Sequence, residues 1–222
     1  MILRNSTHLD TRNIERMFAA AVDQWPHDGA QVFVRYSRGS DFSGTCYYDS
    51  DRIFVNLGRD NVYPYPLKIN VARPQSNRTH WWRELYTLKL DGPEKLALFI
   101  FLHEFYHRLV KRARRNVRQK EARCDRFATR VLVDDYGCVV RDSRGHLVAR
   151  DAWDFQDLEA FVAAARGPVR KSARKPLART PRRDRAAREA VRDPSPGLVV
   201  ETEMPGLAGG SLGGEQSYLF LV

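Results

Sequence analysis

A stretch that is apolar on every side, yet holds two histidines and a glutamate, constrains the fold of this chain more than any other feature. Residues 96–110 read Leu-Ala-Leu-Phe-Ile-Phe-Leu-His-Glu-Phe-Tyr-His-Arg-Leu-Val. A helix that is apolar all round belongs in the centre of a domain rather than at its surface. Just before it, Asp91-Gly-Pro-Glu94 has the spacing of a capping box, with proline in the first turn. The sequence therefore predicts a buried central helix that begins at this turn.

The polar residues of this stretch form the pattern His103-Glu104-x-x-His107. Residues four apart stack on one helix face, so the two imidazoles can converge on one ion and Glu104 can reach a water bound to it. This arrangement is typical of zinc hydrolases. The alternative is that both histidines are satisfied core residues and Glu104 is a solvated charge. Because two imidazoles and a carboxylate are costly to bury without a partner, the metal-binding interpretation is favoured.

A catalytic zinc ion takes three protein ligands and keeps a fourth position open, so a third ligand must come from elsewhere in the chain. We expect Glu121, because the thirteen residues between His107 and Glu121 are enough to fold a second helix back against the first. Asp125 lies one turn further on the same face and could accept the second ring N–H of a ligating histidine. The competing third ligands are Asp125 itself, Cys124 and His146. Cys124 is expected to be a core residue that faces away from Glu121 and Asp125, and His146 to be an exposed loop residue.

These two segments resemble a known family. His103–His107 and the segment Lys120-Glu-Ala-Arg-Cys-Asp-Arg-Phe-Ala-Thr-Arg-Val-Leu-Val133 are similar to the motifs of the ImmA/IrrE family of small zincin-type metallopeptidases. The resemblance covers about residues 90–135 and implies a minimal zincin fold. It also implies that His103, His107 and Glu121 are zinc ligands and that Glu104 is the catalytic glutamate. SprT-like proteases share the five-residue motif, but they usually take a histidine as third ligand, and no histidine lies between His107 and His146.

The rest of the chain predicts a small α+β domain. Helical periodicity recurs on both sides of the central helix, and β-branched and aromatic residues mark three strands of a small, mostly antiparallel sheet. Residues 58–90 hold three prolines and predict an irregular connection with at most one short strand. We expect the sheet to pack on the central helix and on the helix that follows it. The expected helices span residues 10–25, 116–135 and 155–165, the expected strands residues 31–37, 42–48 and 52–57, and a hairpin residues 138–150.

Positive charge gathers in two blocks. Residues 108–126 carry a net charge of +7 and residues 170–192 one of +8, so the formal +10 of the chain leaves −5 for the remainder. Cations at a helix C-terminus complement the helix dipole, which gives Arg108, Lys111 and Arg112 an ordinary structural role. The alternative is a rim that contacts phosphates. We predict a metallopeptidase domain over residues 1–166 and a basic, then glycine-rich, mostly disordered tail over residues 167–222, with a transient helix near residues 182–191.

The sequence favours a cytoplasmic protein that does not contact membranes. No apolar run approaches membrane-spanning length, and the residues after Met1 lack the parts of a secretory signal. The cysteines are three in number and widely spaced, which suits a reducing compartment.

The predicted function is a zinc metallopeptidase that hydrolyses a protein or peptide substrate, with Glu104 as general base. Tyr106, Tyr136 and His146 are candidate donors to the oxyanion. The alternative is a nucleic-acid-associated accessory or regulatory protein whose metal site is structural or vestigial. In either case the arginine-rich segments could contact nucleic acid without sequence specificity.

Overall fold

The structure is a computed structural model that describes residues 1–115, 121–163 and 216–218. Met1–Gly167 and Gly214–Val222 belong to one compact unit, and Pro168–Gly213 to another. All elements described below belong to the first unit. The predicted domain boundary at residue 166 and the predicted transient helix near residues 182–191 lie outside the described residues.

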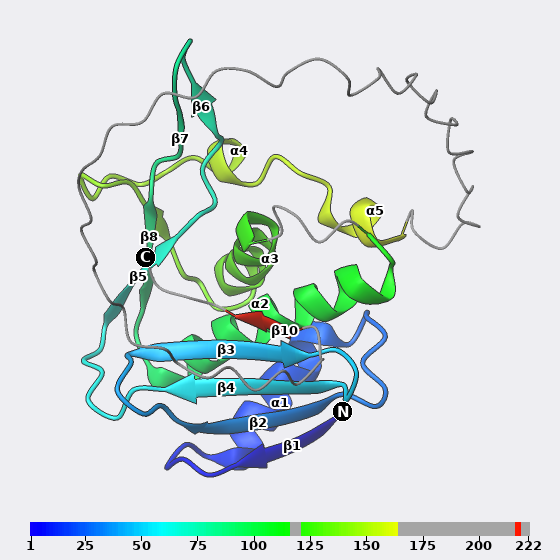
Figure 1. Ribbon diagram of the computed structural model, residues 1–222. Helices are drawn as coiled ribbons and strands as arrows, with labels where there is room; N and C mark the ends of the chain where they lie inside the picture. Colours follow the sequence, from blue (N-terminus) through cyan, green and yellow to red (C-terminus); the bar gives the residue numbers. More distant parts are fainter. Residues whose placement is uncertain (116–120, 164–215, 219–222) are drawn as a thin grey trace, which may run out of the picture. The chain divides into compact units, whose positions relative to one another are not determined.

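The described residues form helices and short strands in an α+β arrangement (Figure 1), as predicted. The helices are α1 (Thr11–Val22), α2 (Pro93–Arg112), α3 (Glu121–Asp134), α4 (Arg150–Trp153) and α5 (Leu158–Ala163). The strands are β1 (Ile2–Asn5), β2 (Gln31–Tyr36), β3 (Phe42–Tyr47), β4 (Arg52–Leu57), β5 (Tyr65–Ile69), β6 (Gln75–Ser76), β7 (Trp81–Trp82), β8 (Tyr86–Leu90), β9 (Val140–Arg141) and β10 (Gln216–Tyr218).

The main sheet has five strands in the order β1-β2-β4-β3-β10. The pairs β1–β2 and β2–β4 are parallel, while β3–β4 and β3–β10 are antiparallel, so this sheet is mixed. The pairs in the other two sheets, β5–β8, β8–β9 and β6–β7, are all antiparallel. Antiparallel pairing therefore prevails among the described strands, as the sequence predicted.

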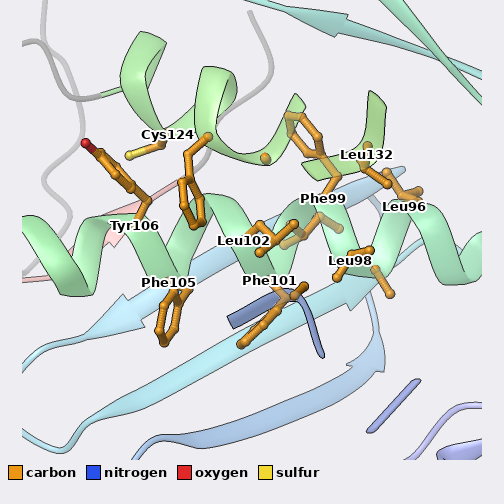
Figure 2. Close-up of a cluster of buried hydrophobic side chains, with 14 of the residues drawn as sticks. Leu96, Leu98, Phe99, Phe101, Leu102, Phe105, Tyr106, Cys124 and Leu132 are labelled. Carbon is orange, nitrogen blue, oxygen red and sulfur yellow. The ribbon is translucent and has the colours of Figure 1, made fainter. Parts of the chain in front are cut away.

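Helix α2 lies between the main sheet and α3 (Figure 1), which explains why it is apolar on every side. All of its residues from Leu96 to Val110 are buried. Figure 2 shows Phe101 and Phe105 pointing from α2 toward the strands, while Phe99 and Tyr106 point toward α3. The prediction of a buried central helix is confirmed.

The start of α2 differs in detail from the prediction. The N-cap is Gly92, which has no side chain to cap with, and Asp91 instead accepts a hydrogen bond from Lys95 Nζ at 3.0 Å. The predicted capping box with Asp91 was therefore wrong. Pro93 lies in the first turn, where its missing N–H costs nothing. At α1 the predicted N-cap Asp10 is confirmed, since its side chain accepts from the backbone N–H groups of Arg12 and Asn13.

Residues 58–90 are more regular than their prolines indicated. They hold two strands of the sheet β5-β8-β9 and the two-stranded hairpin β6–β7. Pro66 lies within β5 and Pro74 directly precedes β6. The prediction of at most one short strand was wrong here. Both β5 and β8 alternate buried with more exposed residues, a strand signal that the neighbouring prolines led the sequence reasoning to overlook.

Several other short elements also differ from the prediction. Strand β1 was not predicted, and the predicted hairpin over residues 138–150 is reduced to β9 and a single bridge between Arg141 and Leu147. Strand β10 falls within the segment predicted to be disordered. Among the helices of the described residues, none is long and apolar enough to cross a membrane.

Candidate metal centre

Helix α2 brings the two motif histidines together at one buried point. His103 and His107 are 0% and 1% exposed. Their ring centroids are 4.9 Å apart and their Nε2 atoms 3.1 Å apart. Both side chains lie on one face because they are one helical turn apart. Two ring nitrogens at this separation repel each other unless a proton or a cation lies between them.

The first residue of α3, Glu121, completes this group. Its Oε2 lies 3.1 Å from His103 Nε2, and its Oε1 lies 3.4 Å from His107 Nε2. The side chain is 56% exposed, so Glu121 lies where the buried histidines meet the surface. Burial opposes the ionisation of this carboxyl, but its contacts with His103 and His107 outweigh that effect and hold the pKa of Glu121 well below its usual value.

These separations fit a small divalent metal ion. Zinc bonds of about 2.0–2.1 Å in a tetrahedral arrangement place neighbouring ligand atoms roughly 3.3 Å apart. The two imidazole nitrogens and the carboxylate are 3.1 to 3.4 Å from one another. Imidazole and carboxylate are also donors that zinc accepts. Both the spacing and the chemistry of the donor set are therefore compatible with zinc.

Asp125, one turn along α3 from Glu121, orients His103. Its Oδ1 lies 2.8 Å from His103 Nδ1, and its Oδ2 accepts the backbone N–H of Asn70 at 2.8 Å. A carboxylate on Nδ1 keeps the proton there and turns the Nε2 lone pair toward the site. Burial alone would lower the pKa of His103, but Asp125, Glu121 and Glu104 outweigh it and raise the pKa to about 10 in the absence of a metal ion.

Cys124 is a further candidate ligand, and here the sequence reasoning was wrong about its direction. The ligand atoms of His103, His107 and Cys124 all lie within 4.8 Å of one another. Cys124 is completely buried, and Figure 2 shows it among the apolar side chains between α2 and α3. Residues three apart share a helix face almost as well as residues four apart, and this rule could have indicated Cys124 from the sequence.

Glu104 lies against the main sheet. It is 0% exposed, and its carboxylate packs closely on Gly44 in β3. A Cβ atom at position 44 would lie 2.5 Å from Glu104 Oε1 and 2.8 Å from Glu104 Cγ. Only glycine leaves room for this side chain, because other residues would press a Cβ into it. Gly44 is thus a site-forming residue that the sequence reasoning missed.

The other predicted site residues are engaged elsewhere. His146 is 73% exposed and contacts Asp142 at 3.2 Å. The Tyr106 hydroxyl is buried and donates to the Leu158 carbonyl at 3.0 Å. Tyr136 follows α3 in the chain, and its backbone carbonyl accepts a hydrogen bond from Lys95 in the first turn of α2. In the described part of the chain, no hydrogen bond joins any of these three side chains to His103 or His107.

A large cavity adjoins the centre. It has a volume of 1020 Å³ and includes Glu121 and Asp125 in its wall. The hairpin β6–β7 contributes Trp81 and Trp82 to the same wall lining. This volume is at the upper end of the range of small-molecule binding pockets. The cavity could not be predicted from the sequence, because its walls come from segments far apart in the chain.

Comparison of the chain with protein-family models, with curated proteins and with solved structures finds no match. The description of the candidate metal site therefore rests on the structure and the sequence. It defines a buried group of His103, His107 and Cys124 that is a possible metal-binding site, on a helix with the His-Glu-x-x-His pattern.

Proposed function

We propose that this protein is a zinc-dependent metallopeptidase in which His103, His107 and Glu121 hold the metal. The observation that supports it most is the convergence of two imidazole nitrogens and one carboxylate at separations of 3.1 to 3.4 Å. Asp125 behind His103 is the outer hydrogen-bond partner that ligating histidines usually have.

Glu121 is proposed as third ligand in preference to Cys124. Its oxygens approach both ring nitrogens closely, and its partial exposure would leave the metal accessible to a substrate. Cys124 lies within the apolar cluster between two helices, where buried cysteines commonly act as small core residues. A catalytic metal requires an open position, which a fully buried ligand set would not provide.

The roles of the surrounding residues follow from this arrangement. When bound, zinc would lower the pKa of a coordinated water to about 7 and polarise the scissile carbonyl. Glu104 would accept a proton from the attacking water and deliver it to the leaving amine. Asp125 holds His103 in the tautomer that presents Nε2 to the site. Gly44 keeps Glu104 against β3 and so fixes its direction.

The test compares hydrolysis and zinc content in Glu104→Gln and wild-type protein. We expect Glu104→Gln to retain zinc and to lose at least about a hundredfold in hydrolysis of a general protein substrate, because general base catalysis contributes about 10²–10⁴-fold. The matched control is Glu94→Gln, which makes the same change in the first turn of α2. It should retain both zinc and activity.

Wild-type protein that binds zinc but hydrolyses no peptide bond would overturn the proposal. The metal site would then be structural or vestigial, as in the alternative of a nucleic-acid-associated accessory protein. Hydrolysis that survives unchanged in Glu104→Gln would contradict it equally, because the activity would then come from another site or a contaminant.

A further inference from the structure

The cavity beside the candidate metal centre has an apolar part in its wall. The large apolar side chains come from β3, β5, α2, the strand β7 and the segment after α4, and they include Phe42, Leu67, Trp81, Trp82, Phe99 and Phe155. Trp81 and Trp82 are 73% and 46% exposed. Large aromatic surfaces left in water are costly, and paired aromatic side chains at a cavity mark a binding surface.

The lining of the same cavity holds more cations than carboxylates. Its lining includes Lys68, Arg83, Arg123 and Arg126, against the carboxylates of Glu121 and Asp125. Both carboxylates are directed at the histidines. The charge that remains for a bound molecule is therefore cationic, and an anionic group is its complement.

Arg83 is a cation of this lining with unused hydrogen-bonding capacity. Its Nη1 donates to the Asn70 carbonyl at 3.0 Å. Its Nε is buried and has no hydrogen-bond partner among the described residues. Arg126, by contrast, is held by the carbonyls of Val71 and Ala72 and by Gln156. Because Nε is inaccessible, a ligand in the cavity would reach Arg83 through Nη1 and Nη2, for which the Asn70 carbonyl is the one hydrogen-bond partner among the described residues.

Asn70 connects Arg83 to the metal centre. Its carbonyl accepts from Arg83, and its backbone N–H donates to Asp125, which in turn contacts His103. The cavity and the histidine pair are thus fixed to the same backbone segment. A molecule held by Arg83 would lie at a defined place relative to the reacting centre.

We propose that this cavity binds a peptide segment in which a large apolar or aromatic side chain neighbours an aspartate or glutamate, with Arg83 as the residue that recognises the carboxylate. The inference rests on the proposed peptidase function, because it assigns the specificity of that site. The apolar side chain packs on Trp81 and Trp82, and the carboxylate accepts from the Arg83 guanidinium as a charge-assisted hydrogen bond.

A binding experiment tests this without depending on turnover. The zinc-loaded full chain carrying Glu104→Gln is immobilised and exposed to a synthetic random octapeptide library, and the retained peptides are sequenced. We expect enrichment of aspartate or glutamate beside phenylalanine, tyrosine, tryptophan or leucine. Replacing glutamate by glutamine in the most enriched peptide should weaken its binding about tenfold, because it removes the charge from a charge-assisted hydrogen bond.

Adding Arg83→Gln should abolish the acidic preference and leave the aromatic preference, while Trp82→Ala should do the reverse. Arg83→Lys should restore part of the acidic preference. The control is Arg78→Gln, which removes the same charge from an exposed arginine of the same hairpin that does not line the cavity. It should change neither preference.

The outcomes separate the two proposals. A protein that hydrolyses peptides but retains no acidic and aromatic sequences, or whose selection is unchanged by Arg83→Gln, overturns the specificity inference alone. A library in which no sequence is enriched also overturns it. If wild-type protein hydrolyses nothing, yet the selection depends on Arg83 and Trp82, the cavity is a peptide-binding site and the peptidase proposal fails.

Discussion

Arg108 lies one residue after His107 and holds α2 in place. It is 1% exposed, and its guanidinium contacts both carboxylate oxygens of Asp51 at 2.6 and 2.9 Å. It also donates to the carbonyls of Pro26 and Asp28. The sequence indicated an ordinary cation at a helix end or a contact to phosphate. The structure instead makes Arg108 an internal crosslink between α2 and two loops, and its burial keeps the guanidinium away from a phosphate at the surface.

This crosslink predicts a stability loss. Arg108→Met should lower the free energy of unfolding by about 3 kcal/mol, because it breaks a buried ion pair that also satisfies two carbonyls. Urea unfolding of the two proteins measures the difference. Arg112→Met is the matched control, since Arg112 contacts the same Asp51 at 3.0 Å but is 46% exposed. Its effect should stay below about 1 kcal/mol.

The difference in unfolding free energy between wild type and Arg108→Met should also depend on pH. The hydrogen bond from Arg108 holds the pKa of Asp51 below its ordinary value of 3.8, although burial acts in the opposite direction. A carboxyl with a lowered folded-state pKa stabilises the protein fully above the unfolded value and loses this effect as pH falls through the folded-state value. The gap between wild type and Arg108→Met should therefore be constant near pH 6 and shrink below about pH 4. A gap that widens on acidification would contradict the assignment.

At this scale the sequence predicted the residues that share a helix face. His103, His107, Glu121 and Asp125 converge because each pair obeys the spacing of four residues along a helix. Gly44, Asn70 and Arg83 could not be found in this way. They reach the centre through the packing of strands and loops against α2 and α3, and single-sequence periodicity carries no information about that packing.

The contact between α2 and β3 is the element-scale feature that places Glu104. Gly44 lies on the face of β3 that packs on α2, opposite Glu104 and Ile100. The adjacent Thr45 points to the other face of the sheet, because alternate strand residues face opposite sides. The strand and the helix can approach closely only where a side chain is missing from the strand.

Gly44→Ala should therefore displace Glu104 without removing the metal ligands. We expect zinc content to be unchanged and hydrolysis to fall about a hundredfold, since a displacement of about 1 Å at a catalytic group can cost that much. Thr45→Ala, on the opposite face of the same strand, should leave both properties near wild type. Equal activity in Gly44→Ala and wild type would show that Glu104 is not held by β3, or that it is not the catalytic base.

Most long elements were predicted from the sequence, and most short ones were not. Helices α1 and α2 and strands β2, β3 and β4 begin and end within a few residues of their expected bounds, because each has a clear apolar period. Strands β1, β6 and β7 contain two to four residues, too few to show a period, and the alternation of β5 and β8 was overlooked among prolines. Their pairing depends on partners distant in sequence, which local patterns do not encode.

At the scale of the whole molecule, positive charge is concentrated in two separate blocks of the sequence. The block at residues 108–126 contains structural arginines, of which Arg108 and Arg126 are buried. The block at residues 170–192 carries a net charge of +8 and lies outside the described residues. Contact with nucleic acid through this second block, like the domain boundary at residue 166, stays a prediction.

Replacing the ten lysines and arginines of residues 170–192 by glutamine should weaken binding to duplex DNA and flatten its salt dependence. Each phosphate contact removed should reduce the slope of log affinity against log salt by about 0.9. Fluorescence anisotropy at several salt concentrations measures this slope. Because these changes spare α2 and α3, zinc content should not change. An identical slope in both proteins would exclude this block as a nucleic-acid contact.

The account depends on two histidines and one glutamate binding the same zinc ion, and X-ray absorption at the zinc edge of protein purified without added metal tests this most directly. We predict one zinc per chain in a nitrogen and oxygen shell at about 2.0–2.2 Å, with no sulfur near 2.3 Å. Zinc content should fall in Glu121→Ala and stay unchanged in Cys124→Ala. Equal zinc in wild type and a His103→Ala/His107→Ala double variant, or a sulfur shell that disappears in Cys124→Ala, would contradict the account.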